Sequence, residues 1–225
     1  MAKDTRLIKA AKKMKRFGGE LPLVEEISNS KGSIDIYGDQ VYDESLYRND
    51  NIASGISSLD EITDTHVKYY RENGFLAIQN AFTSAQISDA ITGLDNCISG
   101  KYPDYDGIQY ERVKDVDYES LSFDEKKKQI RKLSYFLDHE KLFQSIVADP
   151  QFLSVIKKLI NATPEGHGDQ ALFKPPIIGR EKPWHQDLAF FDLPSGTKII
   201  GCWIALDKAT LENGCMHVKP GTHNE

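Results

Sequence analysis

Residues 183–187 read Pro-Trp-His-Gln-Asp, so His185 and Asp187 stand two positions apart. In a β-strand, residues at i and i+2 face the same side, and the spacing therefore predicts a strand that presents an imidazole and a carboxylate together. These are two of the three side chains of the 2-His-1-carboxylate triad, which holds non-haem Fe(II) with positions left open. An isolated His-x-Asp also occurs by chance, as an interior histidine followed by a strand-end aspartate.

Further motifs surround this pair in a fixed order. They are Lys174-Pro175-Pro176 upstream, and Trp203-Ile204-Ala205-Leu206-Asp207, Asn213-Gly214-Cys215 and Pro220-Gly221-Thr222-His223 downstream. Together with Trp184-His185-Gln186-Asp187, they resemble the motifs of the phytanoyl-CoA dioxygenase family of Fe(II)/2-oxoglutarate oxygenases. The resemblance covers residues 59–225, and it is strongest after residue 170.

Hydrophobic periodicity and capping signals predict helices first and strands afterwards, which indicates an α+β protein. The expected helices are 63–73, 83–98, 123–133, 139–148 and 149–160, and the expected strands are 75–78, 171–174, 184–191, 198–206 and 215–218, with a loop at 100–120. The resemblance implies a double-stranded β-helix, a jelly-roll of the cupin type, with the N-terminal helices packed outside it.

The resemblance also implies roles for individual residues. His185 and Asp187 match the first two iron ligands, Lys132 and Gln170 match positions that contact 2-oxoglutarate, and Trp203 matches a tryptophan beside this cosubstrate. Two of these residues have simple structural alternatives. Lys132 could be one more solvated lysine of a charged run, and a tryptophan such as Trp203 is often part of a core.

In the family, the distal histidine ligand and the arginine that pairs with 2-oxoglutarate follow the Pro-Gly-Thr-His turn, whereas this sequence stops at Glu225. We therefore expect a fragment that lacks the C-terminal strands of the jelly-roll. Two alternatives from other classes stay open. One is a catalytically silent jelly-roll that binds or regulates, and the other is a cupin-like metal protein that uses His217 as a ligand.

For the complete protein, the resemblance implies a dioxygenase that uses Fe(II), 2-oxoglutarate and O₂ to hydroxylate an unactivated C–H bond, releasing succinate and CO₂. The expected substrate is a small or lipid-like molecule. The carboxylate of Asp187 favours hydroxylation over halogenation, because related halogenases carry a small residue at this position. Desaturation and ring closure are the rival reactions within the same enzyme class.

Composition excludes several other classes of protein. The net charge of −6 and the pI near 5.6 argue against nucleic acid as a partner. No apolar run is long enough to span a membrane, and three cysteines without a Cys-x-x-Cys spacing favour a reducing cytoplasm. Residues 1–58 form a basic and irregular extension before the oxygenase domain of residues 59–225. Residues 1–19 predict a solvated terminal helix rather than a membrane-binding or transit helix, and nothing indicates a particular oligomeric state.

Overall fold

The computed structural model describes residues 33–34, 48, 51–111, 113, 116–182, 184–191, 193–194 and 196–224. The helix predicted within residues 1–19 and most of the irregular segment 28–58 lie outside these ranges. After the short strand β1 (Ser33–Ile34), the described elements continue with the helices η3 (Leu59–Glu61), α3 (Asp64–Asn73) and α4 (Ser84–Ile98), and the other strands follow later in the chain.

The two helices α3 and α4 are where their end signals predict them. The hydroxyl of Thr83 accepts a hydrogen bond from the backbone N–H of Gln86 at 3.2 Å, and the Gln86 side chain accepts one from the N–H of Thr83 at 2.8 Å. This reciprocal capping box satisfies two donors that have no partner inside the helix. Helix α3 ends at Gly74, whose φ of +82° is a left-handed conformation that a side chain disfavours.

The later helices agree in part with the sequence. Helix α7 (Pro150–Ile160) begins after Asp149, and the segment 139–148 contains η4 (Lys141–Phe143) and α6 (Gln144–Val147). The helix predicted over 123–133 is wrong, because α5 (Phe123–Lys127) ends early and β3 (Ile130–Ser134) follows. Pairing of β3 with two neighbouring strands outweighs the local preference of a lysine-rich segment for helix.

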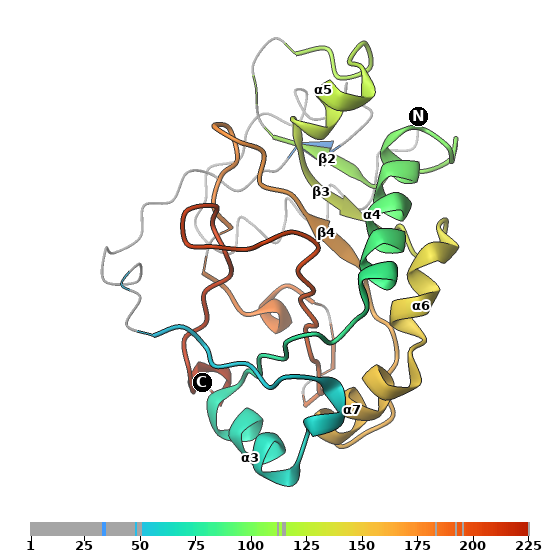
Figure 1. Ribbon diagram of the computed structural model, residues 1–225. Coiled ribbons are helices and arrows are strands. Elements are labelled where there is room, and N and C mark those ends of the chain that lie inside the picture. Colours follow the sequence, from blue (N-terminus) through green and yellow to red (C-terminus); the bar gives the residue numbers. More distant parts are fainter. Residues whose placement is uncertain are drawn as a thin grey trace.

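Among the described residues, the sheet has four strands in the order β1–β2–β3–β4 (Figure 1). β1 (Ser33–Ile34) runs parallel to β2 (Ile108–Tyr110), whereas β3 is antiparallel to both β2 and β4 (Gln170–Leu172). β2 lies in a segment that the sequence predicts as loop, and β4 confirms the strand predicted near residue 171. The described part of the chain therefore combines helices with a mainly antiparallel sheet, as an α+β protein does.

Two hydrophobic clusters hold these elements together. In the first, α4 packs on the sheet through residues such as Ala90, Leu94, Ile130 and Leu133, and both sheet residues have no exposed surface. The second cluster joins η3, α3 and α7, and its buried residues are Leu59, Ile62, Val67, Val155 and Leu159. Figure 1 shows the coil of residues 174–224 on the side of the sheet away from α4.

Three predicted strands are wrong in the described part of the chain. Segments 184–191, 198–206 and 215–218 run there as coil and turns, and Asp187–Ala189 forms the short 3₁₀ helix η5. The strand predicted at 75–78 is reduced to a single bridge between Ile56 and Ile78. Alternating apolar residues suit a strand, but a strand forms only where a second strand supplies hydrogen bonds, and no described segment pairs beyond β4.

The Pro-Gly-Thr-His turn lies against the C-terminal end of α3. Gly221 donates its backbone N–H to the carbonyl of Asn73 at 2.9 Å, and the Nε2 of His223 lies 3.0 Å from the carbonyl oxygen of Arg71. The imidazole also packs over Gly74, where a Cβ would collide with it. Carbonyls at a helix end have no partner within the helix, so the turn supplies two of the missing donors.

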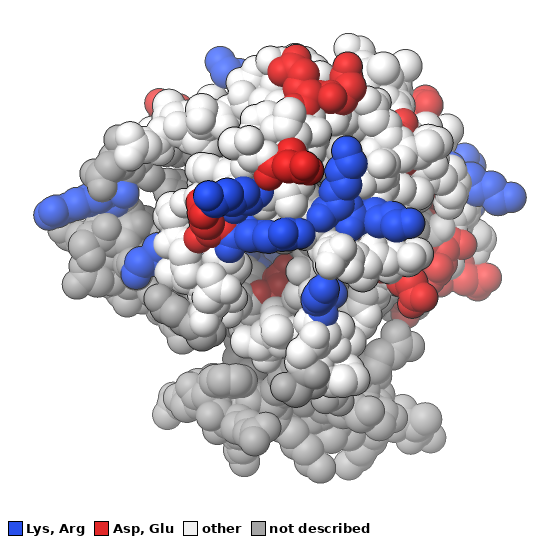
Figure 2. Space-filling model, turned by 90° about the horizontal axis from the view of Figure 1, so that it is seen from below, with Lys and Arg blue, Asp and Glu red and all other residues white. Residues whose placement is uncertain are grey.

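Helices α3 and α7 also form a basic face. Figure 2 shows lysine and arginine side chains gathered on the face of the molecule where these helices lie. A shallow hollow there is lined by Asp64, Val67, Lys68, Arg71, Lys158 and Asn161, none of which belongs to the predicted site. Over the described ranges, no helix combines the length and the apolar character needed to cross a membrane.

Candidate functional site

His185 and Asp187 lie side by side although neither is in a strand. The Nε2 of His185 is 3.3 Å from the Oδ1 of Asp187, and the two side chains are 29% and 56% exposed. Asp187 begins η5, and its carbonyl accepts a hydrogen bond from the N–H of Phe190. The predicted strand is therefore wrong, but a tight turn brings the same two side chains together.

Neighbouring segments surround the pair. The ring of Phe190 stands edge-on to the His185 imidazole, with centroids 5.6 Å apart. A Cβ on Gly201 would lie 3.5 Å from the Oδ2 of Asp187, so the coil before Trp203 passes beside this carboxylate. Gln186 donates from its side chain to the carbonyl of Thr222 at 2.8 Å, which ties the segment to the Pro-Gly-Thr-His turn.

The electrostatics of the pair favour an ionised carboxylate. A hydrogen bond from His185 lowers the pKa of Asp187, and the positive charge of Lys182 acts in the same direction. Partial burial opposes these effects without cancelling them. Asp187 therefore carries its charge at neutral pH, which is the state that a metal ligand requires.

The pair fits one metal ion. Imidazole nitrogen and carboxylate oxygen bind divalent metals at about 2.0–2.2 Å, so one ion can contact two atoms that lie 3.3 Å apart. Nitrogen together with carboxylate oxygen is also the donor set of non-haem Fe(II) sites. Within the described ranges, no third His, Cys, Asp or Glu joins them in a group that could hold a metal.

The predicted cosubstrate residues lie on the sheet and on the coil beside it. Lys132 on β3 pairs with Leu172, and Ser134 pairs with Gln170, so Lys132 and Gln170 share one face of the sheet. Leu133, which lies between Lys132 and Ser134 in β3, faces the buried core with α4. Lys132 is thus a strand residue rather than a member of a solvated helix. Trp203 is 49% exposed and does not lie in a core.

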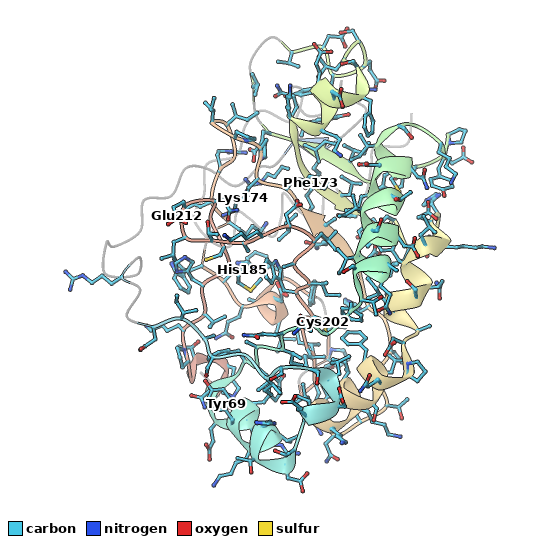
Figure 3. All side chains as sticks on the ribbon, in the orientation of Figure 1. Tyr69, Phe173, Lys174, His185, Cys202 and Glu212 are labelled. Atoms are coloured by element: carbon cyan, nitrogen blue, oxygen red, sulfur yellow. The ribbon has the colours of Figure 1, made fainter. Side chains whose placement is uncertain are left out.

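Two further motifs are packed together. The Lys174 side chain crosses Gly214, where a Cβ would lie 2.6 Å from the Nζ of Lys174. Gly214 has a φ of +79°, and Asn213 closes the turn by accepting from the N–H of Thr210 at 2.7 Å. Figure 3 shows His185 near the middle of the molecule, with Lys174 above it and Tyr69 of α3 below.

His217, the ligand of the cupin-like alternative, has other neighbours. Its ring stands edge-on to Trp184 with centroids 6.4 Å apart, and its Nε2 lies 4.0 Å from the Sγ of Cys215. The indole of Trp184, the residue directly before His185, is thus a neighbour of His217. His217 serves as a matched control for His185 because both histidines touch an aromatic ring.

Three charged residues near the site carry no sequence signal. Glu111, Arg131 and Arg180 form a buried ion-pair cluster, in which Glu111 is 1% exposed. They stand far apart in the chain, and no spacing connects them. The one sequence signal that could have pointed to Arg131 is the alternation of side chains in a strand that contains Lys132.

Comparisons with known proteins give the family. The family model described as Phytanoyl-CoA dioxygenase (PhyH) matches residues 70–225. Phytanoyl-CoA dioxygenase domain-containing protein 1 of Danio rerio is 27% identical over 197 residues, which is 74% of this chain and 67% of that protein. The peroxisomal phytanoyl-CoA dioxygenase of Bos taurus is 29% identical over 160 residues, 69% of this chain and 46% of its own length.

A probable phytanoyl-CoA dioxygenase of Caenorhabditis elegans is 28% identical over 163 residues, 69% of this chain and 51% of its own. This chain therefore spans about two thirds of the Danio rerio protein and about half of the other two. No solved structure matches the chain. Since the family model matches more than half of the sequence, this chain belongs to the phytanoyl-CoA dioxygenase family.

Proposed function

We propose that the protein is an Fe(II)- and 2-oxoglutarate-dependent dioxygenase that hydroxylates an unactivated C–H bond of a small or lipid-like molecule. The observation that carries this proposal is the 3.3 Å separation of the His185 Nε2 and the Asp187 Oδ1 in a member of this family. O₂ is the second cosubstrate, and succinate and CO₂ are the products of 2-oxoglutarate. The four-stranded sheet would be part of the jelly-roll fold of this family.

In this proposal His185 and Asp187 hold the iron, and the bound iron supplies the oxidative chemistry that protein side chains cannot perform. Before binding, the Nε2 of His185 faces the carboxylate of Asp187. The ring must present a free lone pair to a metal, so metal binding at this nitrogen would replace its hydrogen bond to the carboxylate. The lowered pKa of Asp187 keeps its carboxylate ionised, and the hydrogen bond between the two side chains orients the ring of His185.

Lys132, Gln170 and Trp203 would contact 2-oxoglutarate. Lys132 and Gln170 lie on the same face of the sheet, opposite the face that packs on α4, so an ammonium and a carboxamide point to one side. A lysine there suits one carboxylate of a dicarboxylic acid. Trp203 follows Gly201, which passes beside Asp187.

The test is the turnover of 2-oxoglutarate by the full-length protein with Fe(II), measured as succinate. His185→Ala and Asp187→Ala should each abolish Fe(II) binding and turnover while circular dichroism shows a folded protein. His217→Ala is the matched control and should keep both properties. Unchanged turnover in either ligand variant would refute the assignment, and loss of metal binding in His217→Ala would favour the cupin-like alternative.

A silent jelly-roll is the second candidate, and a specific observation favours it. Within the described ranges the pair has no third ligand, and two side chains alone hold Fe(II) loosely. A folded wild-type protein that neither binds Fe(II) nor consumes 2-oxoglutarate would establish this candidate. If turnover occurs, mass analysis of the product separates the reactions, because hydroxylation adds one oxygen and desaturation removes two hydrogens.

The remaining proposals concern domain organisation and location. Residues 59–225 would form the oxygenase domain, and residues 1–58 an extension before it. We place the protein in the cytoplasm, whereas the name of the Bos taurus relative places that protein in peroxisomes. Fractionation of source cells, with peroxisomal and cytosolic markers, decides between the two locations.

A further inference from the structure

The buried carboxylate of Glu111 is held by two arginines from distant parts of the chain. Its Oε1 lies 3.0 Å from an Nη1 of Arg131 on β3, and its Oε2 lies 3.0 Å from the Nε of Arg180. Glu111 is 1% and Arg131 7% exposed, so these charges are shielded from water. Hydrogen-bonded charge pairs at this separation are the strong ones among polar contacts.

The same cluster holds backbone as well as side chains. The guanidinium of Arg131 donates to the carbonyl of Arg180 at 3.1 Å and to the carbonyl of Glu181 at 3.0 Å. Glu111 in turn accepts from the backbone N–H of Arg180 at 3.3 Å. Three main-chain groups of two consecutive residues are thus bonded to side chains of the sheet region.

Arg131 fastens this segment at both ends. Its own carbonyl accepts a hydrogen bond from the N–H of Phe173, directly after β4. Its side chain donates to the carbonyls of Arg180 and Glu181, at the other end of the segment. The segment then runs through Lys182, whose charge acts on Asp187, to His185 four residues beyond Glu181. The described residues from 182 to 186 belong to no helix or strand, so the sheet holds the ligand segment through Arg131 and Glu111.

We propose that Glu111, Arg131 and Arg180 are positioning residues. They hold the metal-ligand segment at the position relative to the sheet in which His185 and Asp187 can bind one ion. This inference rests on the proposed function, because it assumes that these two residues are the ligands. A planar fork with several donors reaches two carbonyls and a carboxylate at once, which the single ammonium of a lysine does not. Partners that hydrogen-bond a metal ligand directly typically change metal affinity by about 10- to 100-fold, and these residues act on the same segment of chain.

The experiment measures Co(II) binding by its visible absorption in the full-length protein, together with hydrogen exchange of amides 181–190 without metal. Arg131→Lys keeps the positive charge but loses the fork, and it should weaken Co(II) binding by about 10-fold or more and speed exchange in this segment. Arg180→Met is the second variant. Its side chain is 26% exposed, so the fold tolerates its loss more easily, and a smaller effect in the same direction is expected.

Glu140→Gln is the matched control. Glu140 is a second buried carboxylate, 4% exposed, but its partners are Asn96 and Tyr102 rather than the ligand segment. This variant should lower the melting temperature and leave Co(II) affinity and exchange of 181–190 unchanged. If both arginine variants bind Co(II) as tightly as Glu140→Gln does, or exchange at the wild-type rate, the positioning role is refuted.

A failure of the proposed function gives a different result. Wild-type protein that binds no Co(II), or His185→Ala that binds it as tightly as wild type, would overturn the ligand assignment and this inference with it. Wild-type binding that depends on His185 but not on Arg131 or Arg180 would overturn the positioning role alone.

Discussion

The Nε2 of His185 and the Oδ1 of Asp187 lie 3.3 Å apart on a coil that turns into a 3₁₀ helix. Two residues that alternate along a strand would share a face, but here a turn produces the contact. The contact lowers the pKa of Asp187, and Phe190 and Gly201, which both follow the pair in the chain, lie beside His185 and Asp187 respectively. The pair is thus formed locally, and the surrounding coil shapes its neighbourhood.

Replacing the carboxylate of Asp187 should remove the charge that the proposed metal site requires. Asp187→Asn keeps the size of the side chain. Loss of a residue that only supports a metal ligand lowers metal affinity by up to roughly 100-fold, and we expect the loss of a ligand to lower Co(II) affinity further. Asp207→Asn, at another exposed aspartate, should bind normally. Equal Co(II) affinity in the two variants, measured by titration, would exclude Asp187 as a ligand.

Gly74→Ala should break the contact between α3 and the Pro-Gly-Thr-His turn. A left-handed φ costs a residue with a Cβ about 1–2 kcal/mol. At Gly74 the new methyl group also collides with the His223 imidazole, and overpacking adds about 1–3 kcal/mol. Gly100 has a φ of +80° with open space around it, so Gly100→Ala isolates the backbone cost. Urea unfolding should show the larger loss for Gly74→Ala, and equal losses would contradict the packing of His223.

Gly93→Ala in α4 should destabilise the protein, although alanine normally favours a helix over glycine by about 0.5–1 kcal/mol. A Cβ there would lie 2.8 Å from Cε2 of Phe143 and 2.9 Å from Cγ of Glu140, and both side chains are buried. Overpacking costs about 1–3 kcal/mol and therefore outweighs the helix preference. Ser88→Ala, on the exposed face of α4, should change the free energy of unfolding by less than about 0.5 kcal/mol. A melting temperature above that of wild type for Gly93→Ala would show that α4 does not approach Phe143 so closely.

Glu140→Gln should lose stability at neutral pH and converge with wild type in acid. Burial raises the pKa of Glu140, but hydrogen bonds from Tyr102 and Asn96 outweigh it and leave the pKa below its ordinary 4.5. The stabilisation by the ionised group is therefore complete above pH 4.5 and disappears as the pH falls through the lower folded-state value. Urea unfolding between about pH 3 and pH 7, a range around the ordinary pKa of a carboxyl group, measures the effect. The difference in the free energy of unfolding between wild type and Glu140→Gln should narrow in acid. A constant difference over this range would contradict it.

Loss of Glu140 should also act on Tyr102. The hydrogen bond to Glu140 raises the pKa of the Tyr102 hydroxyl to about 12. In Glu140→Gln this pKa should fall toward 10, the ordinary value for tyrosine. The absorbance of tyrosinate during an alkaline titration follows the change, and an unaltered titration would show that the two groups are not bonded.

The sequence by itself determined the elements whose signals are local. Thr83 and Gln86 mark the start of α4, Gly74 marks the end of α3, and Asp149 marks the start of α7, because each cap is formed within a few residues. The choice of His185 and Asp187 was equally local, since a spacing of two keeps the side chains within reach in a strand or in a tight turn. The order of motifs was sufficient to predict the family, which the comparisons confirm.

Tertiary structure alone decided which segments pair and which distant charges meet. Residues 130–134 follow a lysine-rich helix but form β3, because strands on both sides supply hydrogen bonds that local composition does not contain. Segments 184–191 and 198–206 alternate like strands and remain coil in the described structure, because none of the described segments pairs with them. Glu111, Arg131 and Arg180 come together across 69 residues of chain. A buried carboxylate requires partners for its charge, but the sequence does not specify which arginines the fold will place beside it.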